Sequence, residues 1–238
     1  MRRLLMILLL AAASLPGAVF NFSSSFETGT EGWTIKTYGF VLPGGTGPVQ
    51  VASGGASGGY LETEDTMNGF LFFIAPPTWT GDFTGGTLSF YLRNQNPGNY
   101  GGSVQPLVWL TDGTTNLFAL SGPTLPGVSG VDWTFSSIPL SLSFPSWSTN
   151  PSSLVAPAPA VVSTVLSNVT QVAILGDWVS RYYGHPLGCT IPNNDCRDIT
   201  GLDEVRLYSS EIPEPGTAGL LLLGLAAAAG WRRAGRKA

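Results

Sequence analysis

Side chains that perform acid–base or nucleophilic chemistry are sparse in this chain of 238 residues. There is a single histidine, His185, and no Gly-x-Ser-x-Gly segment lies between a predicted strand and a predicted helix, where it would present a nucleophilic serine. Paired carboxylates catalyse glycoside hydrolysis, but the fourteen Asp and Glu residues between positions 19 and 212 would supply such a pair by chance. We therefore predict no catalytic residue, and a hydrolase that acts on polysaccharides is the alternative.

The charged residues are distributed unevenly along the chain. Residues 19–212 hold five Lys and Arg against fourteen Asp and Glu, a net charge of −9, whereas six of the eleven basic residues lie near the two ends. Phosphate binding needs clustered Lys and Arg, so this composition excludes DNA and RNA as partners. An acidic body is suited either to solubility or to binding divalent cations.

The two cysteines, Cys189 and Cys196, enclose a short segment rich in Pro and Asn. Only His185 is near them, which is too few ligands for a zinc site. In an oxidising compartment such a pair forms a disulfide, and a loop this short gains about 2–3 kcal/mol from closure. We predict a disulfide that closes a local turn, with a metal site as the alternative.

The first 18 residues have the composition of a secretory signal peptide. Arg2 and Arg3 precede an apolar run from Leu4 to Ala13, and small residues suited to cleavage occur up to Ala13 and at Ala18. The apolar run is much shorter than the ~20 residues of a membrane-spanning helix, which favours a cleaved signal peptide over the alternative, a lasting N-terminal anchor. We predict export through the Sec translocon and cleavage by signal peptidase.

The C-terminal segment has three parts in order: a Pro-Glu-Pro sequence, an apolar run of 15 residues and a basic end. As a helix the run spans about 23 Å, less than a hydrocarbon core of ~30 Å. Positive charges that follow such a run stay in the cytoplasm. The Pro-Glu-Pro residues are Pro213, Glu214 and Pro215. The predicted short transmembrane helix includes Gly216, Leu220, Leu223, Leu225, Gly230 and Trp231. The predicted stop-transfer residues are Arg232, Arg233, Arg236 and Lys237.

This tail, residues 212–238, resembles the PEP-CTERM sorting signal. In that family an exosortase, a membrane cysteine transpeptidase, recognises the Pro-Glu-Pro segment and removes the tail. The protein then goes to the cell surface or the exopolysaccharide matrix of a Gram-negative bacterium. The resemblance therefore implies an exosortase substrate held briefly in the inner membrane, with an unprocessed tail anchor as the alternative.

Between the two ends, short apolar runs with period-two alternation recur, separated by turns rich in Gly, Pro and Asn. In residues 88–93 the alternation places Leu88, Phe90 and Leu92 on one face of a strand. We predict an all-β jelly-roll (galactose-binding-like) β-sandwich over residues 19–211. The Pro-rich stretch 141–160 is predicted to be a long loop rather than a linker between domains, followed by a short helix at 161–168. The predicted strands are 33–38, 48–52, 59–62, 69–75, 88–93, 107–111, 115–120, 133–140, 172–175 and 204–208.

The body also resembles laminin-B-type (laminin IV) domains and jelly-roll carbohydrate-binding modules. The segment FETGTEGWT at 26–34 looks like the opening of these domains, and Trp133 and the segments 165–178 and 201–208 follow in the same order. The residues of 70–94 that match the laminin-B pattern are Phe73, Ala75, Pro76, Gly81, Asp82, Gly86, Leu88 and Phe90. The resemblance implies a non-enzymatic surface or matrix protein that binds polysaccharide or mediates adhesion. A structural coat protein without a specific ligand is a further alternative.

In the jelly-roll modules that the chain resembles, a structural calcium ion often ties the first strand to the last. The matching residues are Glu27 and Asp203, which become neighbours if these strands pair. Calcium takes several oxygen ligands from carboxylates, carbonyls and water. The alternative is that Glu27 is a turn residue and Asp203 is exposed.

Sugar binding would need exposed aromatic rings with polar neighbours, because ring faces stack on the apolar faces of sugars. Most tryptophans of a β-sandwich lie in the core, so a structural role is favoured for each candidate. Among the candidates, Tyr182 and Tyr183, beside Gly184, are the better pair for sugar binding. The aromatic candidates are Trp79, Tyr100, Trp109, Trp147, Trp178, Tyr182 and Tyr183.

Overall fold

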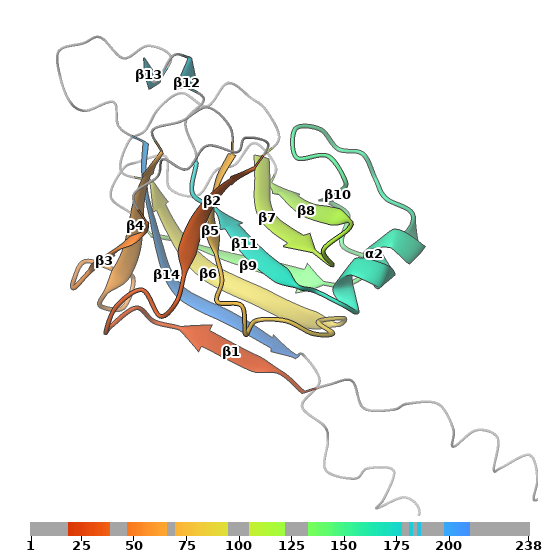
Figure 1. The fold of residues 1–238 in the computed structure, drawn as a ribbon, viewed down its shortest axis with the longest axis horizontal. Helices are drawn as coiled ribbons and strands as arrows, with labels where there is room; N and C mark the ends of the chain where they lie inside the picture. Colours follow the sequence, from red (N-terminus) through yellow and green to blue (C-terminus); the bar gives the residue numbers. More distant parts are fainter. Residues whose placement is uncertain are drawn as a thin grey trace, which may run out of the picture.

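The computed structural model describes residues 19–38, 47–65, 70–94, 105–121, 133–177, 181–182, 185–186 and 198–209. These residues form two antiparallel β-sheets that pack as layers, with one short helix beside them (Figure 1). No helix in these ranges combines the length and the apolar character that crossing a membrane requires. The predicted signal peptide and the predicted sorting tail lie outside the described residues.

The first sheet has six strands, and its centre is the long strand β14. The order is β3-β4-β14-β6-β9, and β1 also pairs with β14. Along one side of β14 runs β6; on the other side β4 pairs with its first half and β1 with its second. The strands are β1 (Asn21–Ser24), β3 (Val49–Val51), β4 (Tyr60–Asp65), β6 (Gly86–Asn94), β9 (Thr134–Leu140) and β14 (Asp198–Ser209).

The second sheet also has six strands, in the order β10-β8-β7-β11-β5-β2. A separate ribbon pairs β12 (Arg181–Tyr182) with β13 (His185–Pro186). The helix α2 (Pro159–Leu166) contacts β7 and β8. The strands are β2 (Thr34–Tyr38), β5 (Phe70–Ile74), β7 (Gln105–Thr111), β8 (Asn116–Ser121), β10 (Trp147–Ser148) and β11 (Gln171–Leu175).

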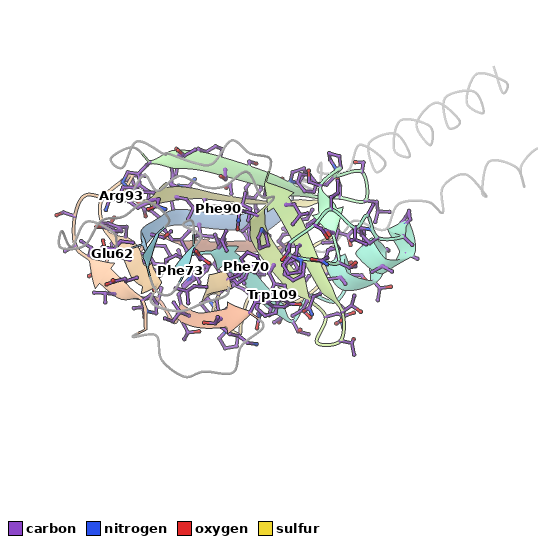
Figure 2. All side chains as sticks on the ribbon, turned by 90° about the horizontal axis from the view of Figure 1, so that it is seen from above. Glu62, Phe70, Phe73, Phe90, Arg93 and Trp109 are labelled. Carbon is purple, nitrogen blue, oxygen red and sulfur yellow. The ribbon has the colours of Figure 1, made fainter. Side chains whose placement is uncertain are left out.

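The hydrophobic core lies between the two sheets, and period-two alternation builds it. Leu88, Phe90 and Leu92 of β6 are almost fully buried, as the sequence predicts, and they belong to one cluster with Phe73 of β5. Figure 2 shows Phe90 and Phe73 on the two different layers. The predicted all-β jelly-roll sandwich is therefore confirmed, and the strand faces follow from the alternation.

The structure differs from the predicted elements at the start of the helix, at the first strand and in the stretch 141–158. The helix begins at Pro159, two residues before its predicted start, because the fixed φ of proline suits the first turn of a helix. The first strand, β1, was not predicted, because NFSS is short and largely polar, and its pairing with Val205–Tyr208 of β14 fixes it in place. The stretch 141–158 is a long loop as predicted, except that it contributes β10.

Replacing one inward-facing and one outward-facing phenylalanine on paired strands tests which face of the first sheet lies against the core. Phe90 is fully buried, whereas Phe135 of β9 is 55% exposed. Phe90→Ala is expected to lower the free energy of unfolding by about 3–5 kcal/mol, because it leaves a cavity in the core. Phe135→Ala should cost less than about 1 kcal/mol. Urea unfolding of both variants provides the measurement. Equal losses of unfolding free energy would contradict the assignment of Phe90 to the core and of Phe135 to the outer face.

Candidate functional site

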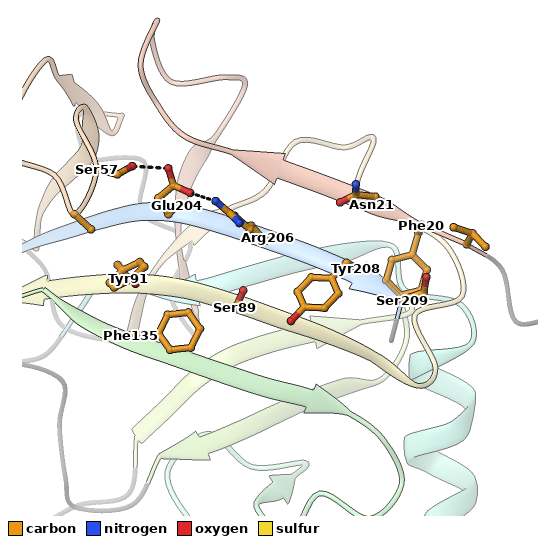
Figure 3. A pocket seen from close by; sticks show the side chains of 12 residues that line it. Phe20, Asn21, Ser57, Ser89, Tyr91, Phe135, Glu204, Arg206, Tyr208 and Ser209 are labelled. Atoms are coloured by element: carbon orange, nitrogen blue, oxygen red, sulfur yellow. Dashed lines mark hydrogen bonds and ion pairs between the residues drawn. The ribbon is translucent and has the colours of Figure 1, made fainter. Parts of the chain in front are cut away.

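A groove of about 950 Å³ crosses the outer face of the first sheet, the face turned away from the core (Figure 3). Strands β1, β6, β9 and β14 form its floor, and the glycine-rich loop 53–59 contributes to one wall. The lining residues are Val19, Phe20, Asn21, Ala56, Ser57, Ser89, Tyr91, Phe135, Glu204, Arg206, Tyr208 and Ser209.

Strand register aligns the outward side chains in rows across the sheet. Residues that face each other on antiparallel strands point to the same side, and successive rows lie two residues apart, or about 7 Å. The first row pairs Tyr91 with Phe135. The second row contains Ser137, Ser89 and Arg206. The third row contains Pro139, Thr87 and Tyr208.

Aromatic rings lie at both ends of the groove. Tyr91 and Phe135 form a tilted pair with ring centroids 5.1 Å apart. Tyr208, two rows further along and about 13 Å away in the strand direction, is 40% exposed. The groove therefore offers two separated ring surfaces with a polar row between them.

A charged pair occupies the middle of the groove. One guanidinium nitrogen of Arg206 (Nη2) donates to Glu204 Oε2 at 2.6 Å, and the Ser57 hydroxyl donates to Glu204 Oε1 at 2.5 Å (Figure 3). The Ser57 hydroxyl, together with the Arg206 guanidinium, holds the pKa of Glu204 below its usual value. The Arg206 side chain is 62% exposed, so its other N–H groups face the solvent.

A β-bulge brings two successive acidic residues to the outer side of β14. The pairing with β6 shifts between Asp203 and Arg206, so that Glu204 and Val205 together oppose one residue, Phe90. Glu204 has a φ of 48°, a left-handed conformation that costs a non-glycine residue about 1–3 kcal/mol. Because of the bulge, Asp203 lies under the loop 53–59 while Glu204 reaches the groove.

Asp203 is fully buried, and its carboxylate binds backbone amides. The N–H of Ser57 donates to Oδ2 at 3.2 Å, and the N–H of Glu204 donates to Oδ1 at 2.7 Å. Burial raises the pKa of Asp203, since it disfavours the charged form, although the amide hydrogen bonds partly oppose this. The carboxylate thus fastens the wall of the groove to its floor.

Glu27, the other predicted calcium ligand, also contacts the loop 53–59. The N–H of Gly59 donates to Glu27 Oε1 at 3.2 Å. Gly58 has a φ of 131°, and a Cβ there would collide with the Glu27 carboxylate, so this position requires glycine. The structure therefore brings both sequence-predicted acidic residues to one glycine-rich loop.

The oxygens at this loop are of the type that calcium prefers. A Cβ on Gly55 would lie 2.6 Å from Asp203 Oδ2, 2.6 Å from the carbonyl oxygen of Gly59 and 2.8 Å from that of Gly58. The described part of the chain has no group of three or more His, Cys, Asp or Glu side chains placed to hold a metal. Two carboxylates with backbone carbonyls fit calcium in donor type, and carbonyl oxygens would have to complete its shell.

Beyond the groove on the same face, Arg93 is enclosed by aromatic rings. Its guanidinium lies 4.6 Å from the ring centroid of Tyr60 and 4.9 Å from that of Trp133, and it donates to the Tyr60 hydroxyl at 2.7 Å. A Cβ on Gly201 would lie 2.8 Å from the Trp133 ring, so glycine leaves room for this stack. Arg93 and Trp133 also donate to the carbonyl oxygen of Gly54, at 3.3 and 2.9 Å, so this cluster ties the loop 53–59 to the sheet.

Three of the tryptophans considered as sugar-binding candidates are buried, which agrees with the structural role that the sequence favours for each of them. Trp79, Trp109 and Trp147 are each no more than 4% exposed. Trp109 packs against other rings and donates to Asn116 Oδ1 at 2.9 Å. An amphipathic ring whose N–H finds an acceptor is readily buried, which sequence alone does not reveal.

Several predicted residues lie where the structure does not describe side chains. Tyr182 forms part of β12, but only its backbone is described. Outside the described residues lie Tyr100, Trp178, Tyr183, Cys189, Cys196 and all the sorting-tail residues. The roles of these residues stay predictions.

The sequence analysis did not identify the groove residues as a site, although strand alternation already assigns some of them to an outer face. The alternation that predicts the core face of residues 88–93 also assigns Ser89 and Tyr91 to the outer face. Phe135 and Tyr208 occupy equivalent outward positions on other strands. What the sequence lacks is the strand order, which brings these residues together.

Comparison with known proteins decides the nature of the C-terminal segment. Residues 211–237 match the family model for the PEP-CTERM protein-sorting motif. The chain ends in a PEP-CTERM sorting motif. The motif covers the predicted tail almost residue for residue, and it indicates an exported protein. No curated protein sequence matches the chain.

One solved structure named here has a TM-score above 0.5, and two carbohydrate-binding modules match with lower scores. The L4b domain of human laminin alpha-2 has a TM-score of 0.54 at 10% sequence identity, covering 82% of this chain and 99% of that domain. A family 11 carbohydrate-binding module of a cellulosomal cellulase from Clostridium thermocellum has a TM-score of 0.43 at 14% identity, covering 82% and 97%. The xylan-binding module CBM15 has a TM-score of 0.44 at 10% identity, covering 82% and 99%. At 10% identity, the similarity to the laminin domain shows the fold alone.

The opposite environments of two aspartates give a pH prediction. Asp112 accepts hydrogen bonds from the amides of Thr115 and Thr114, which lower its pKa, whereas burial raises that of Asp203. A carboxyl-carbon NMR titration in metal-free buffer is expected to give a higher midpoint for Asp203 than for Asp112. The reverse order would contradict the burial of Asp203.

The sign of the effect on stability follows from linkage. Native Asp203 holds its proton more tightly than in the unfolded chain, so its contribution falls as pH rises from the usual Asp pKa towards the raised one. The contribution of Asp112 has the opposite sign: it is present above the usual pKa and is lost as pH falls through the lowered one.

Proposed function

We propose that this exported protein is a non-enzymatic component of the cell surface or extracellular matrix that binds polysaccharide in the groove of its first sheet. The observation that carries the proposal is the arrangement in rows, in which exposed rings flank a polar centre on one rigid sheet. Aromatic faces contact the apolar faces of sugars, and charged or hydroxyl groups bind the sugar hydroxyls.

The groove is elongated, and the ionisable groups that line it are poorly suited to proton transfer. Its floor follows β14 from Glu204 to Ser209, a path of about 17 Å. This length suits an extended chain of sugar rings better than a single small molecule. Of the ionisable groups that line it, Glu204 has a lowered pKa and is already paired, which makes it a poor proton donor near neutral pH.

Localisation follows from the sorting motif together with the predicted signal peptide. We propose that an exosortase removes the tail after export and that the sandwich is then delivered to the surface or the exopolysaccharide matrix of a Gram-negative bacterium. In such an oxidising compartment Cys189 and Cys196 would form the predicted disulfide.

Aromatic substitutions test the binding proposal. Tyr91→Ala and Phe135→Ala are each expected to weaken binding to a retained soluble polysaccharide about tenfold, since each removes a stacking surface. Affinity electrophoresis against a panel of neutral and acidic polysaccharides provides the measurement. Leu154→Ala is the matched control, because Leu154 is 58% exposed but does not line the groove. Unchanged retention of both aromatic variants would refute the groove as the binding site.

We also propose a structural calcium ion at the loop 53–59. Glu27 and Asp203 would supply the carboxylates, and carbonyl oxygens of Gly58 and Gly59 are near enough to complete the shell. When bound, the ion would neutralise the buried charge of Asp203, which otherwise destabilises the fold near neutral pH.

Thermal unfolding tests the calcium proposal. Calcium at 100 times its Kd adds about 2.7 kcal/mol, which corresponds to a rise in Tm of about 5–10 °C for a domain of this size. Asp203→Asn is expected to abolish the rise, whereas Asp112→Asn should retain it because Asp112 lies in the turn between β7 and β8. A Tm that is the same in calcium and in chelator would rule out the ion.

A further inference from the structure

We infer that the groove selects uncharged polysaccharides and rejects acidic ones, and that Glu204 is the residue that determines this selectivity. The inference rests on the proposed polysaccharide binding and names the class of its ligand. It concerns how the Glu204 carboxylate occupies the Arg206 guanidinium beside it.

Arg206 is the only Lys or Arg among the described residues that line the groove. An exposed guanidinium between aromatic surfaces would by itself be a binding site for a carboxylate, because its planar N–H groups match carboxylate oxygens in two parallel hydrogen bonds. Here the Nη2 position is already engaged by Glu204 at 2.6 Å. An acidic sugar would therefore have to displace Glu204 from Arg206.

Glu204 is held so that displacement is unfavourable. Its second oxygen accepts the Ser57 hydroxyl, and the loop carrying Ser57 is itself fixed by Asp203 through the Ser57 amide. The bulge directs the side chain outward, and Val205 next to it is fully buried. The carboxylate is thus anchored from two sides, and an incoming anion would meet a fixed negative charge.

The surroundings reinforce the rejection of anions. The body of the protein carries five Lys and Arg against fourteen Asp and Glu, so a polyanion is repelled at longer range as well. A neutral sugar meets no such penalty. Its hydroxyls both donate and accept, so they can bond the free guanidinium N–H groups and the Glu204 oxygens together.

The aromatic rings do not discriminate between neutral and acidic sugars. Tyr91 and Phe135 at one end and Tyr208 at the other contact the apolar faces of sugar rings whether or not a carboxylate is attached. Selectivity between neutral and acidic chains therefore depends on the central pair, and removing the charge of Glu204 should reverse it while leaving the aromatic platforms intact.

Affinity electrophoresis of the exported, processed protein tests the inference, with mixed-linkage β-glucan and uronate-free xylan as neutral polymers and polygalacturonate and alginate as acidic ones. The unmodified protein should be retarded by a neutral polymer and not by the acidic ones. Glu204→Gln should gain retention on the acidic polymers by about tenfold or more, since the freed Arg206 makes charge-assisted hydrogen bonds. The gain should disappear in Glu204→Gln/Arg206→Gln and weaken when salt is raised.

Asp82→Asn is the matched control, because it removes one negative charge from an exposed turn outside the groove and keeps the oxygen that accepts the Thr84 amide. Equal gains in Glu204→Gln and Asp82→Asn, or strong retention of the unmodified protein on acidic polymers, would overturn the inference. Those results would leave polysaccharide binding standing if Tyr91→Ala still weakened it. Loss of the aromatic effect would instead remove the proposed function itself.

Discussion

The bulge in β14 is the constraint on which the face of the first sheet depends. In a regular strand Asp203 and Glu204 would point to opposite sides, and one of them would enter the core. The extra residue in β14 places both on the outer side, and Val205 returns to the core. One acidic residue then fixes the loop 53–59, and the other engages Arg206 in the groove. The left-handed backbone at Glu204 is the local cost of this arrangement.

The fold could be predicted from the sequence because its signals are local. Alternation in residues 88–93 identifies the buried face of β6, and turn residues mark the ends of most strands. β1 could not be predicted, because its four residues form a strand through pairing with β14 and have no strand pattern of their own. The sorting tail was identified because its three parts are contiguous in the sequence.

The site was harder to predict, for the same physical reason that β1 was. Tyr91, Phe135 and Tyr208 are far apart in the chain, and only the order of strands places them on one face. Burial of tryptophan is equally non-local: Trp79 and Trp109 carry a polar N–H yet lie in the core among other rings. Glu27 and Asp203 were expected to meet through pairing of the first and last strands. They do come to the same loop, and β1 does pair with β14.

The pairing of the first strand with the last has a mechanical consequence. The amide of Ser209 donates to the carbonyl of Phe20, so the two ends of the folded domain leave it at one corner (Figure 1). A pull on Ser209 acts along β14, whose hydrogen bonds to neighbouring strands on both sides run perpendicular to the load. Many bonds must then yield together in shear instead of opening one by one. A polymer bound in the proposed groove would rest on this same strand, so a pull transmitted through the polymer would also load β14 along its length.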